Sequence, residues 1–146
     1  SLNCSNTNIE GDGVNTGTMT HPCPGMTRVS SEFGGRDAPL PGASTNHKGI
    51  DLAAPTGTPV YAADGGKVTI AQYAGNAGKY IAIDHGNGLL TQYMHLNEMH
   101  VKAGEKVTKG QKIGEVGSTG NSTGPHLHFG IKNGELYINP RKYINF

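Results

Sequence analysis

Two histidines separated by one residue lie in the segment GPHLHFGI, and they are the residues best placed for metal or proton chemistry. Apolar and polar residues alternate through this segment, which predicts a β-strand with one buried face. On such a strand His126 and His128 point to the same side, about 6.6–7 Å apart. Both imidazoles can then bind one metal ion, or one can bind the metal while the other acts on its bound water.

A second pair, His47 and Asp51, offers an imidazole and a carboxylate four residues apart. On a fully extended strand this spacing corresponds to about 13 Å, whereas the donor atoms of a tetrahedral zinc site lie only about 3.3 Å apart. The chain must therefore bend between them, and Gly49 permits a bulge or a turn there. Two histidines and one aspartate give the ligand number of a catalytic zinc site that keeps one position open for water.

Another histidine, His95, ends a predicted strand in the segment YMHL and can reach the same site. The three remaining histidines, His21, His85 and His100, lie in turn-like or tail contexts. We expect these three at the surface.

The elements that position these residues are short β-rich segments separated by glycine and other turn residues, a spacing typical of an antiparallel all-β domain. We expect strands at Thr27–Phe33, Pro59–Ala63, Lys67–Tyr73, Lys79–Asp84, Leu89–His95, Lys106–Val107, Lys112–Val116, His126–Lys132 and Glu135–Ile138. Glycine recurs too often for stable helices, so little helix is predicted. The segment Leu96–Met99 is the one place where a helical turn is expected.

One pair of these strands is predicted with its connection. The segment His85-Gly86-Asn87-Gly88 separates Lys79–Asp84 from Leu89–His95, and Asn-Gly between two β-rich runs indicates a tight hairpin. A related local pattern, Gly-x-x-Val, occurs at Gly57 and again at Gly104. Either an internal duplication or the abundance of glycine explains it.

Residues 1–25 are rich in Asn, Thr, Ser and Gly and predict a flexible tail or linker, so the compact domain is expected to span 26–146. Cys4 and Cys23 are the only cysteines, and a disulfide between them is the natural reading for an exported protein. A zinc site built from Cys4, His21 and Cys23 lacks a fourth ligand. The chain begins at Ser1 without an apolar leader, so we expect a mature or excised domain.

Composition excludes several classes of protein. The chain has 146 residues, enough for one domain, with a formal net charge of +1 and 23 glycines. Its arginines, Arg28, Arg36 and Arg141, form no basic run, which argues against nucleic-acid binding. The longest apolar runs have about four residues, far fewer than the roughly 18 that a membrane-spanning helix needs.

Five segments, in this order, resemble the lysostaphin-type (LytM-like) zinc metallopeptidases, which cut peptides in bacterial peptidoglycan. They are FGGR at 33–36, HKGIDL at 47–52, YMHL at 93–96, VTKGQKIGEVG at 107–117 and GSTGNSTGPHLHF at 117–129. The resemblance covers about Ser31 to Tyr143, and the last segment is long and highly specific.

The resemblance implies that His47, Asp51 and His128 bind one Zn²⁺ per chain, and that His95 and His126 are catalytic histidines that do not bind the metal. It implies a small, open antiparallel β-sheet of the duplicated-hybrid-motif type. It also implies a secreted, bacteriolytic metalloendopeptidase acting on peptidoglycan peptides. The bond can be an oligoglycine bridge, a stem-peptide bond or a D-amino-acid cross-link, and either histidine can be the general base. We expect a monomer located outside the cell, in the cell wall or periplasm, or a phage virion-associated lysin.

Some members of the family carry a tyrosine shortly before the first ligand, and residues 37–46 contain none, which leaves oxyanion stabilisation to the histidines or to another loop.

Two other functions compete with this interpretation. A catalytically inactive regulatory or binding relative is one alternative, but such relatives lose ligands and here all five positions are filled. A phosphocarrier of related fold also uses two neighbouring histidines, but it has no need of Asp51 or a metal.

Overall fold

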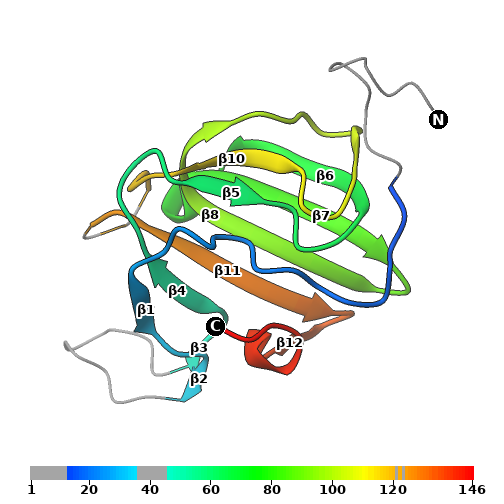
Figure 1. The fold of residues 1–146 in the computed structure, drawn as a ribbon, viewed down its shortest axis with the longest axis horizontal. Coiled ribbons are helices and arrows are strands. Elements are labelled where there is room, and N and C mark those ends of the chain that lie inside the picture. Colours follow the sequence, from blue (N-terminus) through cyan, green and yellow to red (C-terminus); the bar gives the residue numbers. More distant parts are fainter. Residues whose placement is uncertain (1–12, 36–45, 121, 123) are drawn as a thin grey trace.

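The chain folds into a curled antiparallel β-sheet in a computed structural model, which describes residues 13–35, 46–120, 122 and 124–146 (Figure 1). The main path of neighbouring strands is β1 (Arg28–Ser31), β4 (Ile50–Ala53), β11 (His126–Asn133), β8 (Leu89–Met99), β7 (Lys79–Gly86), β6 (Gly66–Tyr73) and β9 (Lys106–Val107). Off this path are β5 (Pro59–Tyr61), β10 (Lys112–Val116) and β12 (Leu136–Ile138), and a separate pair is formed by β2 (Gly34–Gly35) and β3 (Asn46–His47).

Helix is confined to two single 3₁₀ turns, Gly75–Ala77 and Pro140–Lys142, in the part of the chain that the structure describes. None of the helices found there is long and apolar enough to cross a membrane. The prediction of an antiparallel all-β domain with little helix is therefore confirmed.

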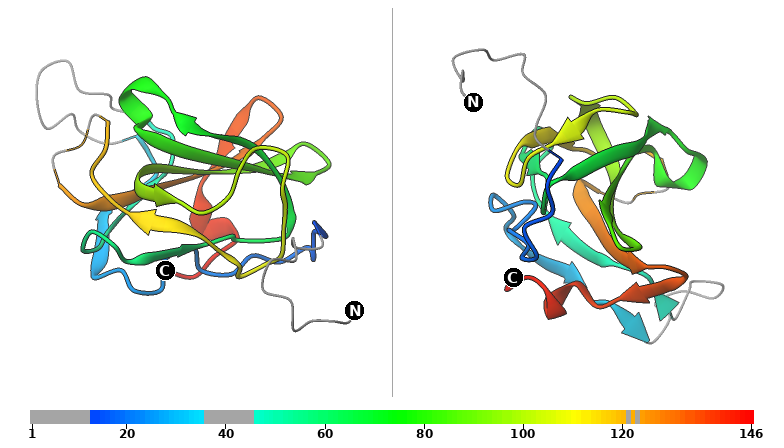
Figure 2. Two further views of the ribbon diagram at one scale, coloured as in Figure 1. Left: turned by 90° about the horizontal axis from the view of Figure 1, so that it is seen from above. Right: turned by 90° about the vertical axis from the view of Figure 1, so that its right-hand side faces the viewer.

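The hydrophobic core lies on one face of the sheet. Alternate residues of β11 and β8, among them Leu127, Phe129 and Tyr93, are fully buried there. Strands β5 and β10 form a second layer over this face, as Figures 1 and 2 show. The opposite face of β11 carries His126 and His128 and is only partly buried, so it is the face available for chemistry.

The predicted hairpin is confirmed, and one neighbouring prediction is wrong. Strands β7 and β8 pair around a tight turn in which Asn87 and Gly88 have φ of 56° and 82°, the conformation that Asn-Gly favours. Leu96–Met99, expected as a helical turn, instead continues β8 and pairs with β10. Pairing with β10 outweighs the weak helical propensity of this segment.

The repeated Gly-x-x-Val pattern adopts one conformation at both of its occurrences. Gly57 and Gly104 have φ of 95° and 97°, values that favour glycine. Three residues later, Val60 and Val107 are each fully buried. The two segments are thus equivalent turns, each leading into a core strand.

Residues 13–25 pack against the domain, so the described core begins before the expected boundary at Met26. The backbone N–H of Thr20 donates to Ala63 O, and that of Tyr61 donates to Pro22 O. Cys23 is fully buried in the core, and burial raises the pKa of its thiol to about 11. Cys4 lies outside the described residues, so its disulfide with Cys23 stays a prediction.

The expectation that His85 lies at the surface is wrong. The residue is 5% exposed and belongs to a directed chain of buried hydrogen bonds. Since the Gly65 carbonyl makes His85 Nδ1 a donor, Nε2 of the neutral ring accepts from the Thr91 hydroxyl, Thr91 Oγ1 accepts from the Tyr93 hydroxyl, and the Tyr93 oxygen accepts from the Ala63 N–H. His85 Nδ1 then donates to a backbone carbonyl, that of Gly65, at 2.7 Å. Every hydrogen in the chain is used when His85 is neutral.

The other two histidines differ from each other. His21 is half-buried, with its ring packed edge-on against Phe146 at 4.9 Å between centroids. His100 is exposed, as expected, and its Nε2 lies 3.2 Å from Glu115.

Candidate active site

The site is built on the register between two neighbouring strands. Asp51 of β4 and His128 of β11 are direct partners in the antiparallel ladder, so their side chains leave the sheet on the same face. His128 Nδ1 lies 2.9 Å from Asp51 Oδ1. Two potential metal ligands that are 77 residues apart in the sequence therefore converge on one point.

His47 is placed by its backbone alone, since its side chain lies outside the described part of the chain. It ends β3, and a bend at Lys48 and Gly49 separates it from β4. The bend expected between His47 and Asp51 is therefore present. Among the described side chains, no group of three His, Cys, Asp or Glu residues is arranged to hold a metal ion.

A glycine is needed at position 49 because no side chain fits there. Its backbone torsion is not the reason, since its φ is not in the positive range. A Cβ at this position would lie 2.6 Å from His128 Nε2 and 2.6 Å from the Phe129 carbonyl oxygen. The His128 ring thus rests against the Gly49 backbone with Nε2, which leaves Nδ1 to face Asp51. A carboxylate oxygen and an imidazole nitrogen at this separation fit two donors of a zinc site, which lie about 3.3 Å apart.

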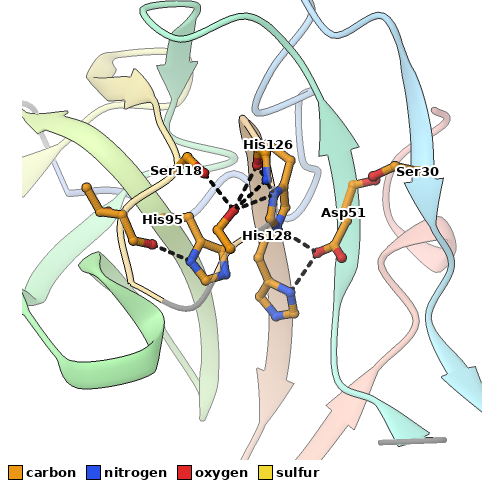
Figure 3. A network of polar contacts seen from close by, with 9 residues as sticks. Ser30, Asp51, His95, Ser118, His126 and His128 are labelled. Atoms are coloured by element: carbon orange, nitrogen blue, oxygen red, sulfur yellow. Dashed lines mark hydrogen bonds and ion pairs between the residues drawn. The ribbon is translucent and has the colours of Figure 1, made fainter. Parts of the chain in front are cut away.

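His95 and His126 lie beside this pair, and unlike His128 they direct Nε2 rather than Nδ1 into the site. His126 Nδ1 donates to the Gly124 carbonyl at 2.9 Å, and His95 Nδ1 donates to the Thr119 carbonyl at 2.8 Å (Figure 3). Their rings are 4.8 Å apart between centroids. Since each Nδ1 is held by a carbonyl, the Nε2 atoms are left for a substrate, and that of His126 is 3.8 Å from Asp51 Oδ1.

A β-bulge directs His95 into the site. Leu96 and Tyr93 of β8 pair with Lys79 and Ile81 of β7, so β8 contains one extra residue at this point. His95 has φ of 66°, a conformation uncommon for a residue with a side chain. Such local strain is often found at functional sites.

Burial controls the charge of His95, which is 8% exposed. Desolvation lowers the pKa of this imidazole, although the bond to the Thr119 carbonyl partly opposes the shift. The neighbouring His126 and His128 also lower it, because a positive charge on either would repel one on His95. His95 is therefore neutral near pH 7.

Two supporting residues in the loop before β11 were not singled out from the sequence. Thr119 holds His95 through its carbonyl, while its hydroxyl donates to Leu96 O and accepts from the Lys79 N–H. Ser122 Oγ donates to the Gly124 carbonyl and lies 3.2 Å from His126 Nδ1. The only sequence signal for both was their position in the segment GSTGNSTGPHLHF.

The structure thus brings together the side chains of four of the five predicted site residues. Asp51, His95, His126 and His128 share one face, at the junction of β4, β11 and β8 (Figure 3). The side chains of Asp51, His126 and His128 are 13–18% exposed, so substrate can reach them. This arrangement combines a carboxylate and an imidazole that could bind a metal with two further imidazoles able to exchange protons.

Comparison with known proteins gives a consistent result. The model of a family described as peptidase family M23 matches residues 45–140. Among curated proteins, the peptidoglycan DD-endopeptidase ShyA of Vibrio cholerae is 42% identical over 120 residues, which cover 82% of this chain and 28% of ShyA. The chain therefore spans little more than a quarter of that relative.

Two solved structures share the fold. The catalytic domain of the antimicrobial peptidase lysostaphin from Staphylococcus simulans superposes with a TM-score of 0.71 at 34% identity, covering 80% of this chain and 90% of that domain. A zinc containing peptidase from Vibrio cholerae gives a TM-score of 0.75 at 35% identity and covers 86% of this chain and 39% of that one.

Proposed function

Because this chain belongs to peptidase family M23, we propose that it is a zinc-dependent endopeptidase that hydrolyses peptide bonds of bacterial peptidoglycan. The observation that carries the proposal is the convergence of Asp51 Oδ1 and His128 Nδ1 beside the Nε2 atoms of His95 and His126. The relatives named as a peptidoglycan endopeptidase and a zinc containing peptidase support it.

Asp51 and His128 would hold the metal together with His47, through Oδ1 of the aspartate and Nδ1 of His128. Both atoms must be unprotonated to act as metal ligands. Zinc supplies a Lewis acid and lowers the pKa of water towards neutrality, so that water becomes a nucleophile at pH 7. One zinc ion per chain is expected.

His95 and His126 would handle the protons. With Nδ1–H held by a carbonyl, each neutral ring offers an Nε2 lone pair that can accept a hydrogen bond or a proton from the attacking water. After protonation the same nitrogen can donate to the oxyanion or to the leaving amine. Because the two rings are 4.8 Å apart, both act on the same small volume.

The bond cleaved is proposed to be a D-amino-acid cross-link, because the relative at 42% identity is named a DD-endopeptidase. Such a substrate lies outside the cytoplasm, so we place the protein in the cell wall or periplasm.

A non-catalytic binding role is less well supported. An inactive relative has no need of two imidazoles with oriented Nε2 atoms, nor of the strained backbone at His95. A phosphocarrier would not need the carboxylate of Asp51 at 2.9 Å from His128.

Digestion of purified cross-linked peptidoglycan, with the new peptide ends identified by mass spectrometry, tests the proposal. The protein should release stem peptides cut at the cross-link, and exhaustive chelation should abolish release. Circular dichroism of the chelated protein should retain the β spectrum, because the core is formed by apolar residues on the other face of the sheet. Full activity after chelation, or no new peptide ends from the metal-loaded protein, would overturn it.

A further inference from the structure

The face of β11 that carries the active site continues towards the other end of the strand. Lys132 lies four residues after His128 on the same face, about 13 Å along the strand. Its partner on β12 is Tyr137, which therefore shares this face. Midway between His128 and Lys132, Gly130 is buried beneath Gln92, whose Oε1 would lie 3.1 Å from a Cβ at this position.

Two lysines lie over the Tyr137 ring. Lys132 Nζ is 5.5 Å from the ring centroid, and Lys48 Nζ, from the bend before β4, is 5.4 Å from it. Both distances are within the range of a cation–π contact. The ring thereby holds two positive charges on the same side of the sheet as Asp51 and His128.

No carboxylate among the described residues forms a salt bridge with Lys48 or Lys132. Other surface cations differ in this respect. Lys112 lies 3.6 Å from a Glu115 oxygen, and Arg141 forms a bidentate salt bridge with Glu32. The charge beside the site therefore lacks an acidic partner within the described chain.

A hydroxyl donor lies on the same face. Tyr80 of β7 accepts a hydrogen bond from Gln92 Nε2, and no described residue accepts the hydrogen of its own hydroxyl. Burial raises the pKa of Tyr80 and the nearby Tyr137 raises it further, so the phenol remains protonated and able to donate. Gln92 is 6% exposed, and its Oε1 is buried without a partner in the described part of the chain.

We propose that Lys48, Lys132 and Tyr137 form a subsite for a free carboxylate of the peptide substrate. This inference rests on the proposed function and adds a determinant of specificity. Two ammonium groups on one ring attract an anion, and the Tyr80 hydroxyl can supply a hydrogen bond. The distance to His128 places the carboxylate about four extended residues from the bond that is cut.

The test compares two substrates of the same shape. One is a cross-linked dimer of stem peptides with free carboxylates, and the other is the same dimer with these carboxylates converted to amides. The metal-loaded protein is assayed with both, as are Lys48→Gln, Lys132→Gln and the double variant. Lys67→Gln is the control, since Lys67 is an exposed lysine on β6, three strands away from Lys132 in the sheet.

The wild type should prefer the free-carboxylate dimer by about tenfold in kcat/KM, and the difference should lie in a lower KM. A factor of about ten corresponds to one charge-assisted contact at a hydrated surface. In the double variant, kcat/KM for the free-carboxylate dimer should fall to the value for the amidated dimer, so that the preference is lost, and Lys67→Gln should keep the preference. The preference should also fall with added salt.

Equal cleavage of both dimers by the wild type overturns the subsite and leaves the peptidase function standing. A preference that survives in the double variant also overturns it. Cleavage of neither dimer overturns the proposed function, and the subsite with it.

Discussion

The imidazole of His128 lies directly against the backbone of Gly49. A Cβ on residue 49 would be 2.6 Å from His128 Nε2 and 2.9 Å from Cε1, closer than real Cβ contacts allow. The glycine therefore sets the ring position that turns Nδ1 towards Asp51.

Gly49→Ala should displace the His128 ring and weaken zinc binding by about 10–100-fold, as loss of a residue that orients a metal ligand does. Titration with zinc in competition with a chelator measures the effect. Gly124→Ala is the control, because a Cβ there meets nothing within 4 Å and zinc affinity should not change. Wild-type affinity in Gly49→Ala would contradict this role.

The strained backbone of His95 predicts an unusual order of stability between the glycine and the alanine variants at this position. Glycine is normally worse than alanine in a strand by about 0.5–1 kcal/mol. At φ of 66°, however, alanine pays a steric cost of about 1 kcal/mol that glycine avoids. His95→Gly should therefore be at least as stable as His95→Ala in urea unfolding.

Met94 supplies the matched comparison, since its φ is not positive. Met94→Gly should be less stable than Met94→Ala. The same order at both positions would show that the bulge carries no strain.

Asp64 ties residues 13–25 to the domain. This carboxylate is 1% exposed and accepts hydrogen bonds from the Thr16 N–H, the Thr16 hydroxyl and the Gly65 N–H. Asp64→Ala leaves these donors without their acceptor and should lower the free energy of unfolding by about 2–3 kcal/mol. Asp84→Ala removes only an exposed bond from the Gly86 N–H and should cost much less. Equal losses in the two variants would contradict the role of Asp64.

His85 should make folding stability depend on pH. Burial lowers the pKa of this imidazole below its ordinary value of 6.5, so the unfolded chain binds more protons than the folded one below that pH. The contribution is fully present above about pH 6.5 and is lost as the pH falls towards the lowered pKa. The free energy of unfolding should decrease from pH 7.5 to 5.5.

His85→Gln isolates this contribution. The variant is expected to be less stable at pH 7.5, because glutamine fits the Thr91 and Gly65 partners less well, but its stability should fall less on acidification. An unchanged slope between pH 7.5 and 5.5 would exclude His85 as its source.

The alternation of apolar and polar residues was enough to predict the local structure of β11. It placed His126 and His128 on one face and Leu127 in the core, as the structure has them. It did not predict which ring nitrogen each histidine presents. That depends on the Gly49 backbone and on the Gly124 carbonyl, which only the folded chain brings to the rings.

Long-range partners explain the predictions that are wrong. His85 follows a strand and precedes a turn, so its sequence context predicts exposure, but Thr91 and Gly65 enclose it. Leu96–Met99 has no strong strand pattern and becomes a strand through β10. Residues 13–25 are held by Asp64 and by hydrogen bonds to the β5 region, which composition does not reveal.

The roles of the two histidines in the His-Leu-His segment can be separated by function. His126→Ala removes an imidazole that would donate to the oxyanion or accept from water, and should reduce peptidoglycan hydrolysis by about 10²–10³. His128→Ala should abolish hydrolysis by removing a metal ligand. His100→Ala changes an exposed residue outside the site and should behave as the wild type.

The zinc content of the two variants shows which of His126 and His128 binds the metal. The measurement is the amount of zinc bound per chain after dialysis, in His126→Ala and His128→Ala prepared identically. We expect one zinc per chain in His126→Ala and almost none in His128→Ala, because of these two histidines only His128 directs Nδ1 at Asp51. Retention of zinc by His128→Ala together with its loss from His126→Ala would contradict the assignment of His128 as the ligand.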